Sequence, residues 1–256
     1  MSEGSHEALV GAQFGSRAEA YLHSAVHAQS ADLDALAALA KGRDGARVLD
    51  LGCGGGHASF NIAPFVGEVV AYDLSSEMLQ VVADAAGKRG LRNVVTQQGP
   101  AEKLPFADGS FDMVVSRFSA HHWRDVDAGL REAARVLKSG GELVMSDTVA
   151  PSNPLADSYF QAIEMLRDCS HGRNYTRAEW EAAVARAGFQ AEVATRFRMR
   201  LEFKSWVERM NTPKLQVEAI RALQTSVSSA ITGYFDTEPD GSFKIEVLLL
   251  QAKKAG

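Results

Sequence analysis

A glycine cluster between two acidic residues is the part of the chain best suited to chemistry. Asp50 follows an apolar run, and glycines stand at positions 52, 54, 55 and 56 directly after it. Because glycine lacks a Cβ atom, it permits positive φ and lets a ligand lie directly on the backbone. A second β-rich run ends at Asp73, about twenty residues on, where a carboxylate can accept hydrogen bonds from ribose hydroxyls. The pattern predicts a nucleotide-sized crevice.

The spacing of the glycines separates two kinds of nucleotide ligand. A dinucleotide fingerprint reads G-x-G-x-x-G and aims a helix N-terminus at a pyrophosphate. Here the run is Gly52-Cys53-Gly54-Gly55-Gly56-His57, so the third glycine comes one residue early and His57 replaces the expected glycine. The carboxylate of Asp50 repels a pyrophosphate and attracts an ammonium or sulfonium group. A cationic ligand is favoured, and an NAD-dependent oxidoreductase is kept as the alternative.

Histidines on loops are the candidate acid–base groups. His121 and His122 follow an expected strand, His27 ends an expected helix, and His171 with Arg173 lies in a polar turn. The pKa of histidine suits proton transfer near neutral pH, so we assign His122 as the candidate general base. At most one of two adjacent histidines can reach a ligand, and the other is then a structural hydrogen-bonding group. The histidines lack the spacing of a metal site, so no metal is expected.

These motifs need a sheet to position them, and the remaining pattern predicts one. Apolar runs of strand length alternate with helix-compatible segments between residues 47 and 147, which is typical of parallel strands buried by helices on both faces. A further strand is expected over residues 189–201, a helical insertion over 204–234, and a final strand over 242–253. Because the short turn at 238–241 cannot return a parallel strand, the final strand is expected to be antiparallel.

Composition limits the classes of function. The chain has 256 residues, 46% of them hydrophobic, which is enough for one large α/β domain. Its formal net charge is −5 and it has no long block of Lys or Arg, so nucleic acid is not an expected partner. Its two cysteines cannot form a disulfide framework, which favours the cytoplasm. Neither a signal peptide nor a membrane span is expected, because no basic and apolar leader and no run of ~20 apolar residues occurs.

Four motifs in order make the resemblance to one family specific. They are VLDLGCGGGH, AYDLSSEML, AEKLPFADGSFDMVVS and LREAARVLKSGGELVMSD, spread over residues 47–147. Together they closely resemble class I S-adenosylmethionine-dependent methyltransferases, most of all the small-molecule branch related to the ubiquinone/menaquinone biosynthesis C-methyltransferases. Beyond residue 147 the resemblance is one of topology alone.

The resemblance implies a fold, a reaction and a cofactor. The implied fold is a Rossmann-like, doubly wound α/β sheet of seven strands with the last strand antiparallel, N-terminal helices and a helical insertion before the last strand. The implied reaction is methyl transfer from S-adenosylmethionine to a small-molecule acceptor. We expect a single domain over residues 1–256, with an N-terminal helical cap (1–45), a cofactor-binding core (46–150) and an acceptor-side part (151–256). Residues 1–15 are polar and small, and we expect them to be frayed.

Carried over position by position, the resemblance assigns donor-binding residues along the crevice. The region of Asp50 receives the ammonium group, and Asp73 the ribose hydroxyls. The family commonly has an aspartate where this chain has Pro100, so adenine recognition is expected through the backbone of Ala101 and Glu102 or through apolar stacking. The assigned donor-binding residues are Tyr21, Asp50, Gly52, Gly54, Asp73, Leu74, Met78, Pro100, Ala101, Glu102 and Arg117.

An apolar stripe in the helical insertion has several readings. We expect it to pack the inserted helices onto the sheet, but it is also suited to lining an acceptor pocket or a homodimer contact. A non-catalytic S-adenosylmethionine-binding module is the second functional alternative. The stripe consists of Trp206, Val207, Met210, Leu215, Val217, Ile220 and Leu223.

Overall fold

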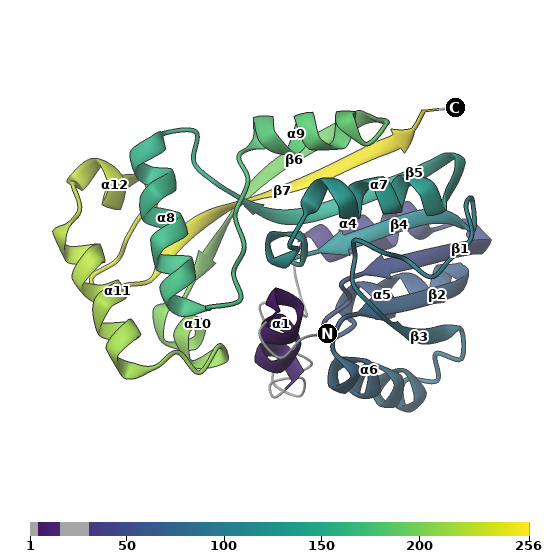
Figure 1. The fold of residues 1–256 in the computed structure, drawn as a ribbon, viewed down its shortest axis with the longest axis horizontal. Helices are drawn as coiled ribbons and strands as arrows, with labels where there is room; N and C mark the ends of the chain where they lie inside the picture. Colours follow the sequence, from purple (N-terminus) through teal and green to yellow (C-terminus); the bar gives the residue numbers. More distant parts are fainter. Residues whose placement is uncertain (1–4, 16–30, 256) are drawn as a thin grey trace.

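The computed structural model describes residues 5–15 and 31–255, and one seven-stranded sheet runs through it (Figure 1). In spatial order the strands are β3 (Val94–Gln98), β2 (Val66–Asp73), β1 (Arg43–Leu51), β4 (Phe111–Arg117), β5 (Leu137–Val149), β7 (Phe243–Lys254) and β6 (Phe189–Leu201). The first five pair in parallel, and β7 is antiparallel to both β5 and β6. The expected Rossmann-like α/β sheet with an antiparallel last strand is confirmed.

Helices cover both faces of the parallel part of the sheet. One face carries α7 (Val126–Val136) and α9 (Arg177–Arg186), and the other carries α4 (Ala31–Ala40), α5 (His57–Ile62) and α6 (Ser76–Lys88). Alternate strand residues supply the two cores, since Val48 packs with α4 and α5 whereas Leu49 packs with α7. Burial on both faces explains why these strands read as continuous apolar runs.

Side-chain caps fix where the helices leave the carboxyl edge of the sheet. The Ser75 hydroxyl accepts from the backbone N–H of Met78 at the start of α6, and the Asp125 carboxylate caps α7. Thr176 and Glu179 form a capping box at the start of α9. Such caps satisfy the first N–H groups of a helix, which lack intrahelical partners. Two short 3-10 helices, η1 (Ala63–Phe65) and η2 (Ala120–His122), complete the connections.

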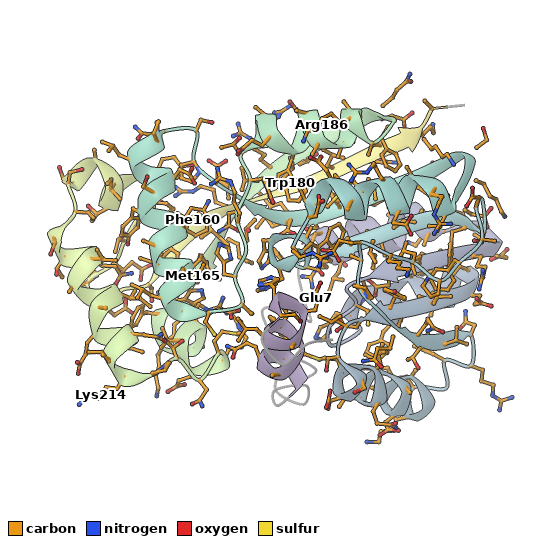
Figure 2. All side chains as sticks on the ribbon, in the orientation of Figure 1. Glu7, Phe160, Met165, Trp180, Arg186 and Lys214 are labelled. Carbon is orange, nitrogen blue, oxygen red and sulfur yellow. The ribbon has the colours of Figure 1, made fainter. Side chains whose placement is uncertain are left out.

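The last third of the chain builds a helical lobe on the far ends of β6 and β7, at the left of Figure 1. These two strands remain paired beyond the end of β5. Phe160 and Trp206 are fully buried in the lobe, and Figure 2 shows side chains filling the space around Phe160. The lobe helices are α8 (Pro154–Arg167), α10 (Phe203–Arg209), α11 (Lys214–Ser226) and α12 (Ser229–Tyr234).

Most of the predicted apolar stripe packs inside this lobe, but the prediction was wrong for Leu215. Its side chain is 76% exposed, whereas Ile220 is fully buried and Val217 and Leu223 pack against the same core. Leu215 lies in the first turn of α11, five residues before Ile220 and so about 140° around the helix. The inward face of α11 is therefore set by the residues at three-residue spacing.

The expectation that residues 1–15 are frayed was wrong for residues 6–15, and residues 1–4 lie outside the described residues. Residues 6–15 form helix α1 (His6–Gly15), which lies beside α6, between the sheet and the helical lobe (Figure 1). Within the described ranges 5–15 and 31–255, no helix combines the length and apolarity needed to cross a bilayer.

Candidate active site and donor pocket

A cavity of about 120 Å³ opens at the carboxyl ends of β1, β2 and β4. The glycine turn forms one wall and α1 forms another, with His6, Glu7, Val10 and Phe14. The predicted donor-binding residue Tyr21 lies outside the described residues, as does His27. The other predicted residues all line this one cavity: Asp50, Gly52, Gly54, Asp73, Leu74, Met78, Pro100, Ala101, Glu102, Arg117 and His122.

The glycine turn is tied to the strand beside it by backbone hydrogen bonds. The N–H groups of Gly52 and Cys53 both donate to the Tyr72 carbonyl, at 2.8 and 3.0 Å. Gly52 and Gly54 have φ of 75° and 48°, in the left-handed region that favours glycine. A Cβ atom at Gly52 would lie 1.8 Å from Ser119 Oγ, whereas one at Gly54 would have no neighbour within 4 Å. Gly54 therefore presents bare backbone to open space in the cavity wall.

Asp50 is a buried carboxylate with one unpaired oxygen. Its Oδ2 accepts hydrogen bonds from the backbone N–H and the hydroxyl of Ser59, at 2.9 and 2.6 Å. Oδ1 has no hydrogen-bond partner among the described residues. Burial, with a smaller contribution from Asp73, raises the pKa of Asp50 to about 6. Because an unpaired buried carboxylate oxygen is costly, the cavity wall here is prepared for a cationic group or a hydrogen-bond donor.

The loop after β3 is held against the cavity by its neighbours. The Tyr72 hydroxyl donates to the Pro100 carbonyl over 3.2 Å. Oε1 of Glu102 accepts from the backbone N–H groups of Arg124 and Asp125, at 2.9 and 3.2 Å. The loop is thus fixed to the segment between η2 and α7, and it faces the apolar side chain of Met78, which is fully buried.

Arg117 forms a buried ion pair that the sequence did not reveal. Its Nε lies 2.5 Å from Oδ2 of Asp32 at the start of α4, and the two side chains are 6% and 0% exposed. Ser146 donates to the same carboxylate oxygen over 3.0 Å. The pair anchors the start of α4 to the floor of the cavity. Phe118 follows with φ 48° and packs against the helical lobe, so it joins the cavity to that lobe.

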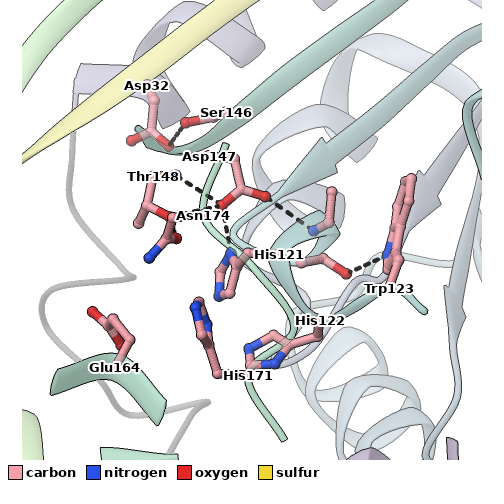
Figure 3. Close-up of polar contacts among 12 residues, drawn as sticks. Asp32, His121, His122, Trp123, Ser146, Asp147, Thr148, Glu164, His171 and Asn174 are labelled. Atoms are coloured by element: carbon pink, nitrogen blue, oxygen red, sulfur yellow. Dashed lines mark hydrogen bonds and ion pairs between the residues drawn. The ribbon is translucent and has the colours of Figure 1, made fainter. Parts of the chain in front are cut away.

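The two adjacent histidines have different surroundings (Figure 3). Nδ1 of His122 lies 3.0 Å from the Ser170 carbonyl, so Nδ1 carries the proton and Nε2 keeps its lone pair. Nδ1 of His121 lies 2.5 Å from Oδ1 of Asp147, and His121 is not part of the cavity wall. One histidine therefore faces the cavity while the other is a hydrogen-bonding partner inside the protein, which is the division of roles expected for this pair.

The electrostatics of the pair differ in the same way. Burial, followed by the neighbouring His121, lowers the pKa of His122 to about 3. Burial also opposes protonation of His121, but the Asp147 carboxylate outweighs it and raises the pKa of His121 above its ordinary value. The pKa of Asp147 is lowered: burial opposes this, and the contact with His121 outweighs it.

Helix α1 supplies cavity residues that sequence reasoning missed. Nε2 of His6 donates to the His122 carbonyl over 2.8 Å, and Glu7 pairs with Arg124 over 2.7 Å. The Phe14 ring meets the His122 ring edge-on, with centroids 4.8 Å apart. The four-residue spacing of Val10 and Phe14 was the available signal for an apolar stripe on this segment.

The other candidates from the sequence lie outside the cavity. His171 is buried and its Nε2 contacts Gln161 Oε1 at 3.2 Å, and burial lowers the pKa of its ring to about 2. Arg173 pairs with Asp157 and Glu179. Among residues 5–15 and 31–255, no three His, Cys, Asp or Glu side chains are arranged to hold a metal ion.

Comparison with known proteins finds similarity over most of the chain. The profile of a family described as "Methyltransferase domain" matches residues 49–145. The uncharacterized protein YafE of Escherichia coli (strain K12) is 48% identical over 200 residues, which cover 78% of this chain and 97% of that protein. The uncharacterized methyltransferase YcgJ of Bacillus subtilis (strain 168) is 37% identical over 200 residues, covering 78% and 79%. A crystal structure of the Bacillus YcgJ protein superposes with a TM-score of 0.84 at 33% identity, covering 88% of this chain and 98% of that one.

Proposed function

Because the chain belongs to the class I S-adenosylmethionine-dependent methyltransferases, we propose that it moves a methyl group from S-adenosylmethionine to a small, uncharged acceptor beside His122. The observation that carries the proposal is the unpaired Oδ1 of Asp50, a buried carboxylate oxygen of a residue that lines the cavity. A cationic amino-acid end satisfies such an oxygen, and a pyrophosphate does not. The family assignment removes the reason for keeping an NAD-dependent oxidoreductase as the alternative.

The residues around the cavity fit the donor. Asp50 would receive its ammonium group, and Gly54 would leave backbone room for its methionine part. The two oxygens of Asp73 each accept one backbone hydrogen bond and keep further lone pairs, as binding a pair of ribose hydroxyls requires. Leu74 and Met78 supply an apolar wall for the adenine. The carbonyl of Pro100 is engaged by Tyr72, so adenine recognition is assigned to the rest of that loop.

The protein's own part in the reaction is positioning, exclusion of water and proton acceptance. When bound, S-adenosylmethionine supplies a methyl group on a sulfonium, whose bond breaks with the electron pair remaining on sulfur. Helix α1 closes one side of the cavity against water. Nε2 of His122 is assigned to orient the acceptor and take its proton as the new bond forms. A weak base suffices, because a hydroxyl becomes strongly acidic as it is methylated.

Charge in the cavity wall restricts the acceptor. The two arginines that line it among the described residues are already paired, Arg117 with Asp32 and Arg124 with Glu7. The carboxylates of Asp50, Asp73 and Glu102 also line the wall. An anionic acceptor would meet net negative charge, and a cationic one would meet the sulfonium. An uncharged acceptor avoids both repulsions.

Methyl transfer from labelled S-adenosylmethionine tests the proposal. The purified protein is incubated with the donor and with the small-molecule fraction of a cell extract, divided into neutral, cationic and anionic pools. We expect label in the neutral pool, and loss of that label in His122→Gln with unchanged binding of S-adenosylhomocysteine by calorimetry. If label appears only in the cationic or anionic pool, the acceptor is not an uncharged molecule and this part of the proposal is wrong. Binding without turnover in all pools would favour the non-catalytic alternative.

A further inference from the structure

The His121–Asp147 pair lies directly behind the proposed base. The ring centroids of His121 and His122 are 4.2 Å apart, and Asp147 holds Nδ1 of His121 at 2.5 Å (Figure 3). Asp147 is itself fixed, because its carboxylate also accepts from the backbone N–H groups of Ala120 and Thr148, at 3.0 and 2.7 Å. It is 3% exposed, so the pair is shielded from solvent.

The surroundings of the two rings determine which of them carries a proton. The Asp147 carboxylate contacts His121 directly, whereas His122 donates to a neutral carbonyl at Ser170. A carboxylate stabilises an imidazolium far more strongly than a carbonyl does. Among the residues that the structure describes, the titratable groups near the two rings are Asp147 from β5, Glu164 and Asp168 from α8 and its end, and His171 from the following loop. His6 from α1 contacts the backbone carbonyl of His122.

Two cations 4.2 Å apart in a buried site repel each other, so the pair holds one proton more easily than two. A single proton shared by the pair is therefore held better by His121, next to Asp147. This leaves His122 neutral, with its proton on Nδ1 and its lone pair on Nε2. That state of His122 is the one that can accept a proton from a bound acceptor.

Resting on the proposed function, we propose that Asp147 is a positioning residue for methyl transfer, acting through His121. By binding Nδ1 of His121, the carboxylate fixes a cation against the His122 ring, which adds to burial in opposing protonation of Nε2 of His122. Asp147 is not among the residues that line the cavity. Its effect reaches the acceptor only through the charge on His121.

Two variants remove this cation in different ways. Asp147→Asn removes the carboxylate that stabilises it. His121→Asn removes the imidazole but keeps a side-chain N–H where Nδ1 donates to Asp147. Because His121→Asn relieves this repulsion, the pKa of His122 should rise by about one to two units, although burial still holds it below its ordinary value. Asp147→Asn also removes an anion that itself raises the pKa of His122, so the rise should be smaller in that variant. At pH 5 the protonated fraction of His122 should rise from about 1% to about 10% or more in His121→Asn, and by less in Asp147→Asn.

Nitrogen chemical shifts of the imidazole rings, recorded on ligand-free protein from pH 4.5 to 8, measure these fractions. Asp168→Asn is the matched control: Asp168 raises the pKa of both histidines, so its loss should not increase protonation of His122. Thermal unfolding reports whether each variant folds. An unchanged His122 titration in the folded variants would overturn the inference. Because no methyl donor is present, this outcome is independent of whether the proposed reaction occurs.

Discussion

The backbone N–H of Gly54 donates to Oδ2 of Asp73 over 2.8 Å, so two motifs nineteen residues apart form one hydrogen-bonded unit. Oδ1 of the same carboxylate accepts from the N–H of Ser75 over 3.0 Å. The glycine turn therefore orients the acidic strand tip, and each carboxylate oxygen keeps lone pairs for a ligand. A substitution at Asp73 should therefore affect both the conformation of the glycine turn and the binding of the ligand.

We expect Asp73→Asn to weaken binding of S-adenosylhomocysteine by about 10- to 100-fold. The amide has one acceptor for two backbone donors, and hydrogen bonds to charged groups contribute about 1.5–3 kcal/mol. Calorimetric titration measures the dissociation constant. Asp84→Asn, an exposed change on α6, is the matched control. Equal affinities of the two variants would remove Asp73 from the donor site.

Alanine substitutions at Gly52 and Gly54 should differ in their effects on the free energy of unfolding and on ligand binding. Gly52→Ala places a methyl 1.8 Å from Ser119 Oγ in a left-handed conformation, and should reduce the free energy of unfolding by about 2–5 kcal/mol. Gly54→Ala meets no neighbour, so its cost should be about 1–2 kcal/mol. Its methyl enters the cavity and should weaken S-adenosylhomocysteine binding. Urea unfolding and calorimetry on both variants check this, and equal losses of stability would contradict it.

The sheet was predictable from the sequence because its signals are local. Apolar runs mark strands buried on both faces, and the short turn before β7 determines its direction. The position of Asp73 at a strand tip follows from the same pattern. Within the site, the ten described donor-binding predictions line the same cavity because the carboxyl ends of neighbouring parallel strands meet at one edge. Their role in binding the donor remains a prediction.

The parts that could not be predicted depend on contacts between distant segments. Arg117 pairs with Asp32, 85 residues away, and nothing in either local pattern identifies the partner. His121 and Asp147 are likewise joined only when β4 and β5 lie side by side. Helix α1 has only a weak apolar stripe, and it is held by His122, Arg124 and α6 instead of by its own sequence. Contacts with other segments, which the local sequence pattern does not reveal, therefore place α1 in the cavity wall.

The raised pKa of Asp50 predicts a pH-dependent stability. Its folded value of about 6 exceeds the ordinary 3.8, so the protonated form is favoured by folding. This contribution is fully present below about pH 4 and is lost as the pH rises through 6. At pH 7.5 Asp50→Asn should stabilise the ligand-free protein by up to about 3 kcal/mol, and the gain should disappear by pH 4. Urea unfolding at pH 7.5, 5 and 4 measures it.

The same substitution should have the opposite effect on the ligand. At pH 7.5 the ammonium of S-adenosylhomocysteine loses its carboxylate partner in Asp50→Asn, so affinity should fall about tenfold or more while stability rises. For the wild-type protein, affinity should fall below pH 6 as Asp50 takes up a proton. Calorimetry at pH 7.5 and 5 tests both statements. If Asp50→Asn is more stable than the wild-type protein and binds S-adenosylhomocysteine equally well, Asp50 does not bind the ligand.

Helix α1 should control how fast a ligand leaves the cavity. Phe14 lines the cavity and contacts the His122 ring, whereas Leu9 on the same helix is 40% exposed and is not part of the wall. Phe14→Ala removes an aromatic contact of about 0.5–1.5 kcal/mol together with apolar burial, so S-adenosylhomocysteine should dissociate roughly 5- to 30-fold faster. Leu9→Ala should leave the rate unchanged. Stopped-flow displacement measures both rates, and equal rates for the two variants would mean that α1 does not have to open for release.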